Sequence, residues 1–275
     1  MRITDSQVHV ITRHTPERPW LRGDGELHGW REFTVERLLA EMDAAGVARA
    51  VVVPPSTEGD RNDTSLQAAR AHPDRLKVVG RLDITAPSSR TALASWLDEP
   101  AMAGLRVTFN RAWSAAWLTD GTADWLWPAA EAAGIPLYAH VPGQVRLLGP
   151  VARRHPGLKL IVDHLGVGAG ARPDAVEEAV GDLVALAREP NVAVKASAVP
   201  TLTEEPYPFA STHHWVRAVV DAYGPRRVFW GSDITRLRCP YRECVSLFTE
   251  QLDFLSNDDL TWIMGRALGE WLNWP

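Results

Sequence analysis

The sequence lacks any long apolar run. No stretch approaches the roughly 20 consecutive apolar residues that a membrane-spanning helix needs. It also lacks the secretory pattern of a charged segment followed by an apolar one, because its first residues already have the character of a strand. We therefore expect a cytoplasmic protein with no membrane partner.

Cysteine is scarce, and charge of neither sign is concentrated in one part of the chain. The two cysteines, Cys239 and Cys244, lack the spacing of a metal knuckle, and one pair is no disulfide framework. The net charge of −5 is spread along the sequence, without the basic run that would bind nucleic acid. We expect reduced thiols, a small-molecule substrate and no nucleic-acid partner, and homo-oligomerisation is left open.

Short β-branched and apolar runs occur throughout the 275 residues, of which 45% are hydrophobic. Several are nearly continuous apolar runs, which is typical of parallel strands that are covered on both faces. No shift in composition marks a linker, so one domain over residues 1–275 is expected. The eight predicted strands span residues 2–10, 49–55, 76–83, 103–109, 135–140, 158–164, 191–197 and 227–233.

Helical patterns separate these runs. The clearest covers residues 34–46, with Thr34 as the N-cap and Gly46 just after the helix. Repeated strand–helix alternation predicts a single-domain (β/α)8 TIM barrel. An open doubly wound sheet is the runner-up, but it needs a phosphate-binding turn that no early strand provides. The further predicted helices span residues 124–134, 173–189, 213–224, 242–255 and 258–272.

The longest predicted insertion, residues 11–33, follows the first strand. Long loops at the C-terminal ends of barrel strands usually cover the active site. Polar side chains at those strand ends indicate chemistry, because burying several of them at one rim requires partners or a ligand. Such residues occur at the ends of five predicted strands, and an arginine lies inside a sixth: Gln7, His9, His140, Asp163, His164, Lys195, Asp233 and Arg106.

The segments "DSQVHV", "YAH", "LIVDHLG", "VAVKAS" and "FWGSD" together resemble the amidohydrolase superfamily over nearly the whole chain. The nearer resemblance is to its amidohydrolase-2 type, which contains small single-domain lactone hydrolases and related decarboxylases. "DHLG" followed later by "GSD" is fairly specific as a combination, whereas "DSQVH" alone is weak. The resemblance implies a barrel that hydrolyses or decarboxylates a small ring or a carboxylated substrate.

The resemblance also implies roles for individual residues. Asp233 matches the aspartate that binds metal where metal is present and activates the attacking water as general base. His140 matches a metal ligand or carbonyl-polarising histidine. His164 matches a second strand-end histidine, with Asp163 as its orienting partner, and His9 matches the second member of a His-x-His pair. The predicted catalytic residues are therefore Asp233, His140, His164 and His9.

Gln7 departs from the family pattern, because it stands where the first histidine of that pair would be. A neutral amide is a poor zinc ligand compared with imidazole, so a two-metal site is not expected. One zinc or manganese ion held by His9, His140 and Asp233 and a metal-free site both remain open. In the metal-free case, Gln7 would hydrogen-bond the substrate or the attacking water.

Several cationic side chains follow or lie within the predicted strands. Because an arginine pairs with a carboxylate through two parallel hydrogen bonds, they suit an acidic substrate. Lys195 is equally compatible with an ion pair inside the barrel, and Arg106 must find a partner. The predicted substrate-binding residues are Gln7, Arg106, Arg61, Lys195 and Arg236, with Trp20, Trp30, Trp113 and Tyr207 as candidate pocket walls.

These features predict a hydrolase of a small, carboxylate-bearing lactone that uses water activated by Asp233. A metal-dependent decarboxylase of an aromatic or unsaturated acid is an alternative, although such enzymes commonly have a carboxylate at the position of Gln7. A cyclic amide hydrolase is another. A barrel that binds a small molecule without turnover is less favoured, because His9, His140, His164 and Asp233 are all present.

Overall fold

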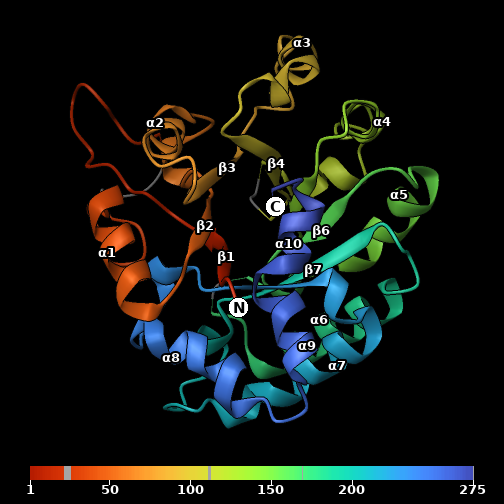
Figure 1. Ribbon diagram of the computed structural model, residues 1–275. Coiled ribbons are helices and arrows are strands. Elements are labelled where there is room, and N and C mark those ends of the chain that lie inside the picture. Colours follow the sequence, from red (N-terminus) through yellow and green to blue (C-terminus); the bar gives the residue numbers. More distant parts are fainter. Residues whose placement is uncertain (22–25, 111–112, 169, 275) are drawn as a thin grey trace.

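A computed structural model describes residues 1–21, 26–110, 113–168 and 170–274 (Figure 1). Eight strands form one sheet in sequence order, with each neighbouring pair from β1 to β8 parallel. The backbone N–H of Asp233, just after β8, donates to the carbonyl of Gln7 in β1 at 2.9 Å, which joins the last strand to the first. The predicted (β/α)8 barrel is thereby confirmed. The strands are β1 (Thr4–Val8), β2 (Arg49–Val52), β3 (Leu76–Gly80), β4 (Met102–Thr108), β5 (Leu137–His140), β6 (Leu160–Val162), β7 (Val192–Ser197) and β8 (Val228–Gly231).

The helices surround the strands (Figure 1). In α1 the Thr34 hydroxyl accepts from the N–H of Arg37 at 3.3 Å, and Gly46 adopts a left-handed φ of 74°, so both predicted caps are confirmed. None of the helices in the described ranges is both long and apolar enough to cross a membrane. The α-helices are α1 (Val35–Ala45), α2 (Asp63–Ala71), α3 (Ser89–Ala94), α4 (Leu126–Ala132), α5 (Leu148–Arg154), α6 (Pro173–Leu186), α7 (His213–Tyr223), α8 (Tyr241–Ser246), α9 (Asn257–Thr261) and α10 (Ala267–Trp271).

The C-terminal helices differ from the prediction. The continuous helix predicted over 258–272 is divided into α9, a π-helical segment Trp262–Arg266, and α10. Within that segment Gly265 packs against the first residues of the chain, where a Cβ atom would come within 2.5 Å of the Arg2 carbonyl oxygen. This close backbone approach requires glycine and interrupts the regular helix. The helix predicted over 242–255 likewise ends early as α8 and continues as a π-helical segment, Leu247–Gln251.

Two layers occupy the barrel interior. The lower layer is apolar and includes Tyr138 and Phe229, which cluster with Trp262 and Leu268 from the C-terminal elements. The upper layer is polar, because His140 lies two residues beyond Tyr138 on the same face of its strand. An apolar floor therefore supports a polar site at the C-terminal ends of the strands.

Candidate active site

Two adjacent cavities, an inner and an outer chamber, lie at the C-terminal ends of the strands and share part of their lining. The inner chamber has a volume of about 70 Å³ and the outer chamber about 350 Å³. Four residues line both and form the junction between them: Ser56, Arg81, Arg106 and Thr108. The inner chamber is further lined by His9, Leu27, His28, His140, His164, Asp233 and Arg236, and the outer chamber by Gly59, Asp60, Leu82, Asp83, Thr85, Val107, Trp113 and Trp117.

Asp233 is the carboxylate of the inner chamber. It follows β8 with a left-handed φ of 51°, a strained backbone of the kind that occurs at functional sites. Its Oδ1 lies 3.1 Å from Nε2 of His9, and its Oδ2 lies 3.4 Å from Nε of Arg236 and 3.8 Å from Nε2 of His164. Burial would raise the pKa of this carboxyl, but the contacts with His9, His164 and Arg236 outweigh burial and hold the pKa well below its usual range. Asp233 is therefore ionised at neutral pH.

Oδ1 of Asp233 is a buried oxygen with few hydrogen-bond partners. Its contact among the described residues is with Nε2 of His9 at 3.1 Å, and no other described side chain donates to it. A buried carboxylate oxygen with so few donors is costly unless a ligand or water also meets it. The geometry therefore suits an oxygen that accepts a proton from a bound molecule.

His140 and His164 form a second pair in the inner chamber, with ring centroids 5.6 Å apart. Burial lowers the pKa of His164 to about 3 and that of His140 well below its usual value, so both imidazoles are neutral. Nδ1 of His164 lies 2.8 Å from the Ser197 hydroxyl, whereas Nδ1 of His140 has no hydrogen-bond partner within the described ranges. Two neutral imidazoles can polarise a carbonyl or hold a metal ion.

Asp163 does not orient His164, which corrects the prediction from sequence. Its Oδ2 accepts from Nε of Arg106 at 2.7 Å, and its Oδ1 pairs with Nζ of Lys195 at 2.9 Å. Burial would raise the pKa of Asp163, but Lys195 and Arg106 hold it far below the usual range. Ser197 is the hydrogen-bond partner of His164 instead, while Asp163 is the partner that Arg106 needed.

Three of the predicted substrate-binding residues do not line either chamber in the described structure. Gln7 and Lys195 are fully buried below the inner chamber, and the Lys195 ammonium donates to Oε1 of Gln7. Arg61 donates through Nε to the Glu58 carbonyl at 3.0 Å and so braces the loop after β2. Arg106 and Arg236 do line the inner chamber, as predicted. Of the candidate pocket walls, Trp113 lines the outer chamber, whereas Trp20, Trp30 and Tyr207 line neither.

Among the ionisable residues that line the inner chamber, two were not singled out from the sequence. Arg81 follows β3 and donates through Nε to the Pro54 carbonyl at 2.6 Å; its position after an apolar strand is the signal that could have identified it. His28 comes from the long loop after β1, where no local pattern indicates function. Its Nε2 accepts from Nε of Arg236 at 3.1 Å, and its Nδ1 lies 2.9 Å from the Thr235 hydroxyl. The expectation that this loop covers the site is confirmed by Leu27 and His28.

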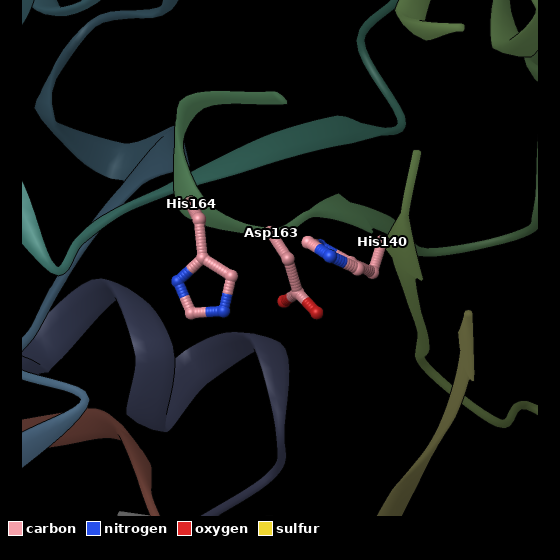
Figure 2. Close-up of side chains that lie close together, drawn as sticks. All are labelled: His140, Asp163 and His164. Carbon is pink, nitrogen blue, oxygen red and sulfur yellow. The ribbon is translucent and has the colours of Figure 1, made fainter. Parts of the chain in front are cut away.

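One group of side chains in the described structure has the spacing of a metal site. Ligand atoms of His140, Asp163 and His164 lie within 4.8 Å of one another, and Figure 2 shows the three side chains together at the ends of β5 and β6. The unpartnered Nδ1 of His140 fits a ligand role. This trio differs from the predicted set of His9, His140 and Asp233. The described residues offer a place for one divalent ion, next to the Arg106 and Lys195 side chains that already pair with Asp163.

The sequence profile of the amidohydrolase family matches residues 4–267. The chain belongs to the amidohydrolase family. It is 29% identical over 215 residues to L-fucono-1,5-lactonase from Burkholderia ambifaria, and this alignment covers 74% of the chain and 70% of that enzyme. Membership of this family identifies the chain as a hydrolase, as the sequence predicted.

Solved structures agree with the fold. An amidohydrolase from Burkholderia multivorans with bound zinc has a TM-score of 0.84 at 22% identity, with all of both chains covered. A probable 2-pyrone-4,6-dicarboxylic acid hydrolase from Acinetobacter baumannii with bound citric acid has a TM-score of 0.80 at 18% identity, covering 99% of this chain and 100% of that one. At these identities the likeness establishes the barrel architecture.

Proposed function

We propose that the chain hydrolyses a small lactone and that Asp233 is the general base. The observation that carries this proposal is the ionised Asp233, whose buried Oδ1 lies at the inner chamber beside Nε2 of His9, at 3.1 Å, and receives a hydrogen bond from no other described side chain. A carboxylate held in this way can accept a proton from water directed at a carbonyl carbon. The similarity to a lactonase supports an ester ring as the substrate.

The surrounding side chains supply the remaining parts of an ester hydrolysis. As water attacks, its proton passes to Asp233 Oδ1, and the negative charge that develops on the carbonyl oxygen needs stabilisation. Arg106, Arg236 and neutral His140 line the chamber in which this oxyanion forms. When the tetrahedral intermediate collapses, the ring C–O bond breaks and the departing oxygen takes the proton from Asp233, which regenerates the carboxylate. The product is an open-chain hydroxy acid.

A divalent ion fits beside this machinery without replacing it. His140, His164 and Asp163 would hold it, and it would polarise the carbonyl as a Lewis acid. The buried cations Arg106 and Lys195 on Asp163 limit how much additional positive charge this position accommodates. We therefore propose one bound ion at most.

The junction of the two chambers favours a carboxylate on the substrate. Arg81 and Arg106 present guanidinium groups there, and Ser56 and Thr108 contribute hydroxyls. Guanidinium and hydroxyl donors around one point form a site for an anionic oxygen pair. The outer chamber adds Asp60 and Asp83, which suit hydroxyl groups on the rest of the substrate.

Asp233→Asn tests the proposal directly. Turnover of a panel of lactones, with and without a carboxylate substituent, is followed by proton release. We expect at least ~10²-fold loss of kcat on the best substrate, because asparagine keeps the shape but cannot act as a base. The matched control is Asp83→Asn, which changes a carboxylate in the outer chamber and leaves kcat within about twofold.

Two results would contradict the proposal. One is unchanged turnover by Asp233→Asn on the best lactone. The other is carbon dioxide release from a free aromatic acid when every lactone is inert, which would identify a decarboxylase. A third outcome would change only the substrate class. If a cyclic imide is opened to a carboxylate without release of ammonia, the substrate is a cyclic amide and not an ester.

A further inference from the structure

His28 lies at the tip of a tight turn in the long loop after β1. Leu27 and Trp30 exchange two backbone hydrogen bonds, of 2.8 and 2.9 Å, and the residues between them, His28 and Gly29, have φ values of 55° and 81°. Positive φ at both central positions is what a two-residue type I′ turn requires. Histidine is one of the few residues besides glycine that are enriched in this backbone region. The turn therefore presents a polar ring at a fixed place.

This turn is bound to the segment that follows β8. Nε1 of Trp30 donates to the Thr235 carbonyl at 3.0 Å, and Nδ1 of His28 lies 2.9 Å from the Thr235 hydroxyl oxygen. That carbonyl belongs to the peptide group that joins Thr235 to Arg236, and Thr235 lies two positions after Asp233. The turn therefore holds the main chain from which both Asp233 and Arg236 project.

His28 also holds the Arg236 side chain. Nε of Arg236 donates to Nε2 of His28 at 3.1 Å. Because a guanidinium nitrogen can only donate, Nε2 must carry a lone pair, and the proton of the neutral ring lies on Nδ1, where the Thr235 hydroxyl oxygen can accept it. Burial, with smaller contributions from His9 and Arg236, lowers the pKa of His28 to about 3. The neutral ring that this hydrogen bond needs is therefore the form present at neutral pH.

The hydrogen bond to His28 leaves the two terminal amino groups of Arg236 available to a ligand. Arg236 lines the inner chamber, and its Nε lies 3.4 Å from Oδ2 of Asp233, next to the proposed base. Among the described residues, none accepts a hydrogen bond from either terminal amino group. A guanidinium with these donors free is suited to an anionic oxygen that lies beside the attacking water.

We propose that His28 is a positioning residue that orients Arg236 toward the oxygen on which negative charge develops. Without His28, Nε and a terminal amino group of Arg236 can form a two-point ion pair with Asp233, which would occupy the cation and the base together. With His28 in place, Nε is engaged and the terminal amino groups serve the substrate. The loop after β1 then completes the active site as well as covering it. This inference rests on the proposed ester hydrolysis.

The hydrogen bond itself can be measured without a substrate. An N–H···N hydrogen bond transmits a scalar coupling between its two nitrogen nuclei. Nuclear magnetic resonance of nitrogen-15-labelled protein should therefore show a coupling between Nε of Arg236 and Nε2 of His28. The same spectra should show His28 protonated on Nδ1 and unprotonated on Nε2. The signals are assigned by their loss in Arg236→Lys and in His28→Asn.

Two substitutions of His28 separate the roles of its two nitrogens. The side-chain amide of asparagine reaches the position of Nδ1 but not that of Nε2, and asparagine tolerates a left-handed backbone. The longer glutamine places its amide oxygen near the position of Nε2, where it can accept from Arg236. We expect His28→Asn to lower kcat about 10–100-fold, the scale of a misplaced catalytic group, and His28→Gln to keep kcat within about fivefold of wild type.

A double-mutant cycle shows whether His28 acts through Arg236. Adding His28→Asn to Arg236→Gln should lower kcat by less than about twofold, because the group that His28 orients is already gone. His14→Asn is the matched control. His14 belongs to the same loop, accepts from the N–H of Trp20 at 2.9 Å and lines neither chamber in the described structure, so kcat and KM should stay within about twofold of wild type. Circular dichroism verifies that each variant is folded.

The inference is overturned if the wild type shows no coupling between the two nitrogens, or if Nε2 of His28 is protonated. It is also overturned if His28→Asn and His28→Gln lower kcat equally, or if His28→Asn costs as much in the Arg236→Gln background as in the wild type. If no lactone is turned over, the hydrolysis proposal fails. The wild-type spectrum still decides whether His28 holds Arg236, so the two failures are distinguishable.

Discussion

The inner and outer chambers are adjacent, but they are built from different parts of the fold. The inner chamber takes its reactive side chains from strand ends, as with His9 after β1, His140 in β5 and Asp233 after β8. The outer chamber takes its walls from the loops after β2, β3 and β4, including Asp60, Asp83 and Trp113. Strand ends are held by the barrel, whereas loops vary without disturbing it. We therefore assign the chemical step to the inner chamber and substrate selection to the outer one.

The two chambers also differ in how their charges are held. Below the inner chamber, Asp163 binds both Arg106 and Lys195, and all three are buried. In the outer chamber, the only described donors to the Asp83 carboxylate belong to its own turn: the N–H of Thr85 at 2.9 Å and the Thr85 hydroxyl at 2.6 Å. The buried charges around Asp163 should therefore contribute to folding stability as well as to catalysis. The Asp83 charge should not contribute to folding stability.

The largest expected effect is on stability. Asp163→Asn leaves Lys195 and Arg106 without their carboxylate, and breaking a buried ion pair in this way costs about 3–5 kcal/mol of the free energy of unfolding. Urea unfolding monitored by tryptophan fluorescence measures the change. Asp83→Asn is the matched control and should lie within about 0.5 kcal/mol of wild type. Equal losses in the two variants would remove the distinction between the chambers.

A smaller effect concerns pH. Burial lowers the pKa of His164 to about 3, whereas an unfolded histidine titrates near 6.5, so below that pH the unfolded state binds a proton that the folded state excludes. The free energy of unfolding should therefore fall as pH drops from 7 to 5, by about 1.4 kcal/mol per pH unit for this residue once the pH is below 6.5. Urea titrations at each pH measure the slope. His164→Asn should flatten it, and an unchanged slope in that variant would show that His164 does not contribute.

The sequence predicted the barrel and the main groups of the inner chamber, because both depend on local patterns. Their positions at the ends of predicted strands, together with the family resemblance, located His9, His140, His164 and Asp233. Position along a predicted strand does not show the height of a residue inside the barrel, because height depends on the register between strands. For this reason Gln7 was expected to contact the substrate, although the fold buries it one level below His9.

Residues on loops were harder to predict. Arg61 and His28 both lie in connecting segments, whose paths are determined by contacts between distant parts of the chain. The loop after β1 brings His28 against Arg236, which is 208 positions away in the sequence. No local periodicity reports such a contact, so Arg61 was placed at the substrate and His28 was overlooked.

The smallest expected effect tests the outer chamber alone. The side chain of Trp113 is 47% exposed and meets Trp117 edge to face, with ring centroids 5.0 Å apart, so it forms one wall without contacting the inner chamber. We expect the exposed face of Trp113 to contact the bound substrate, and an aromatic contact contributes about 0.5–1.5 kcal/mol, so Trp113→Ala should raise KM about two- to twelvefold and leave kcat unchanged. Trp113→Phe keeps an aromatic face and should restore most of the affinity. If Trp113→Ala instead lowers kcat at constant KM, the outer chamber takes part in the chemical step, and the division between chemistry and selection fails.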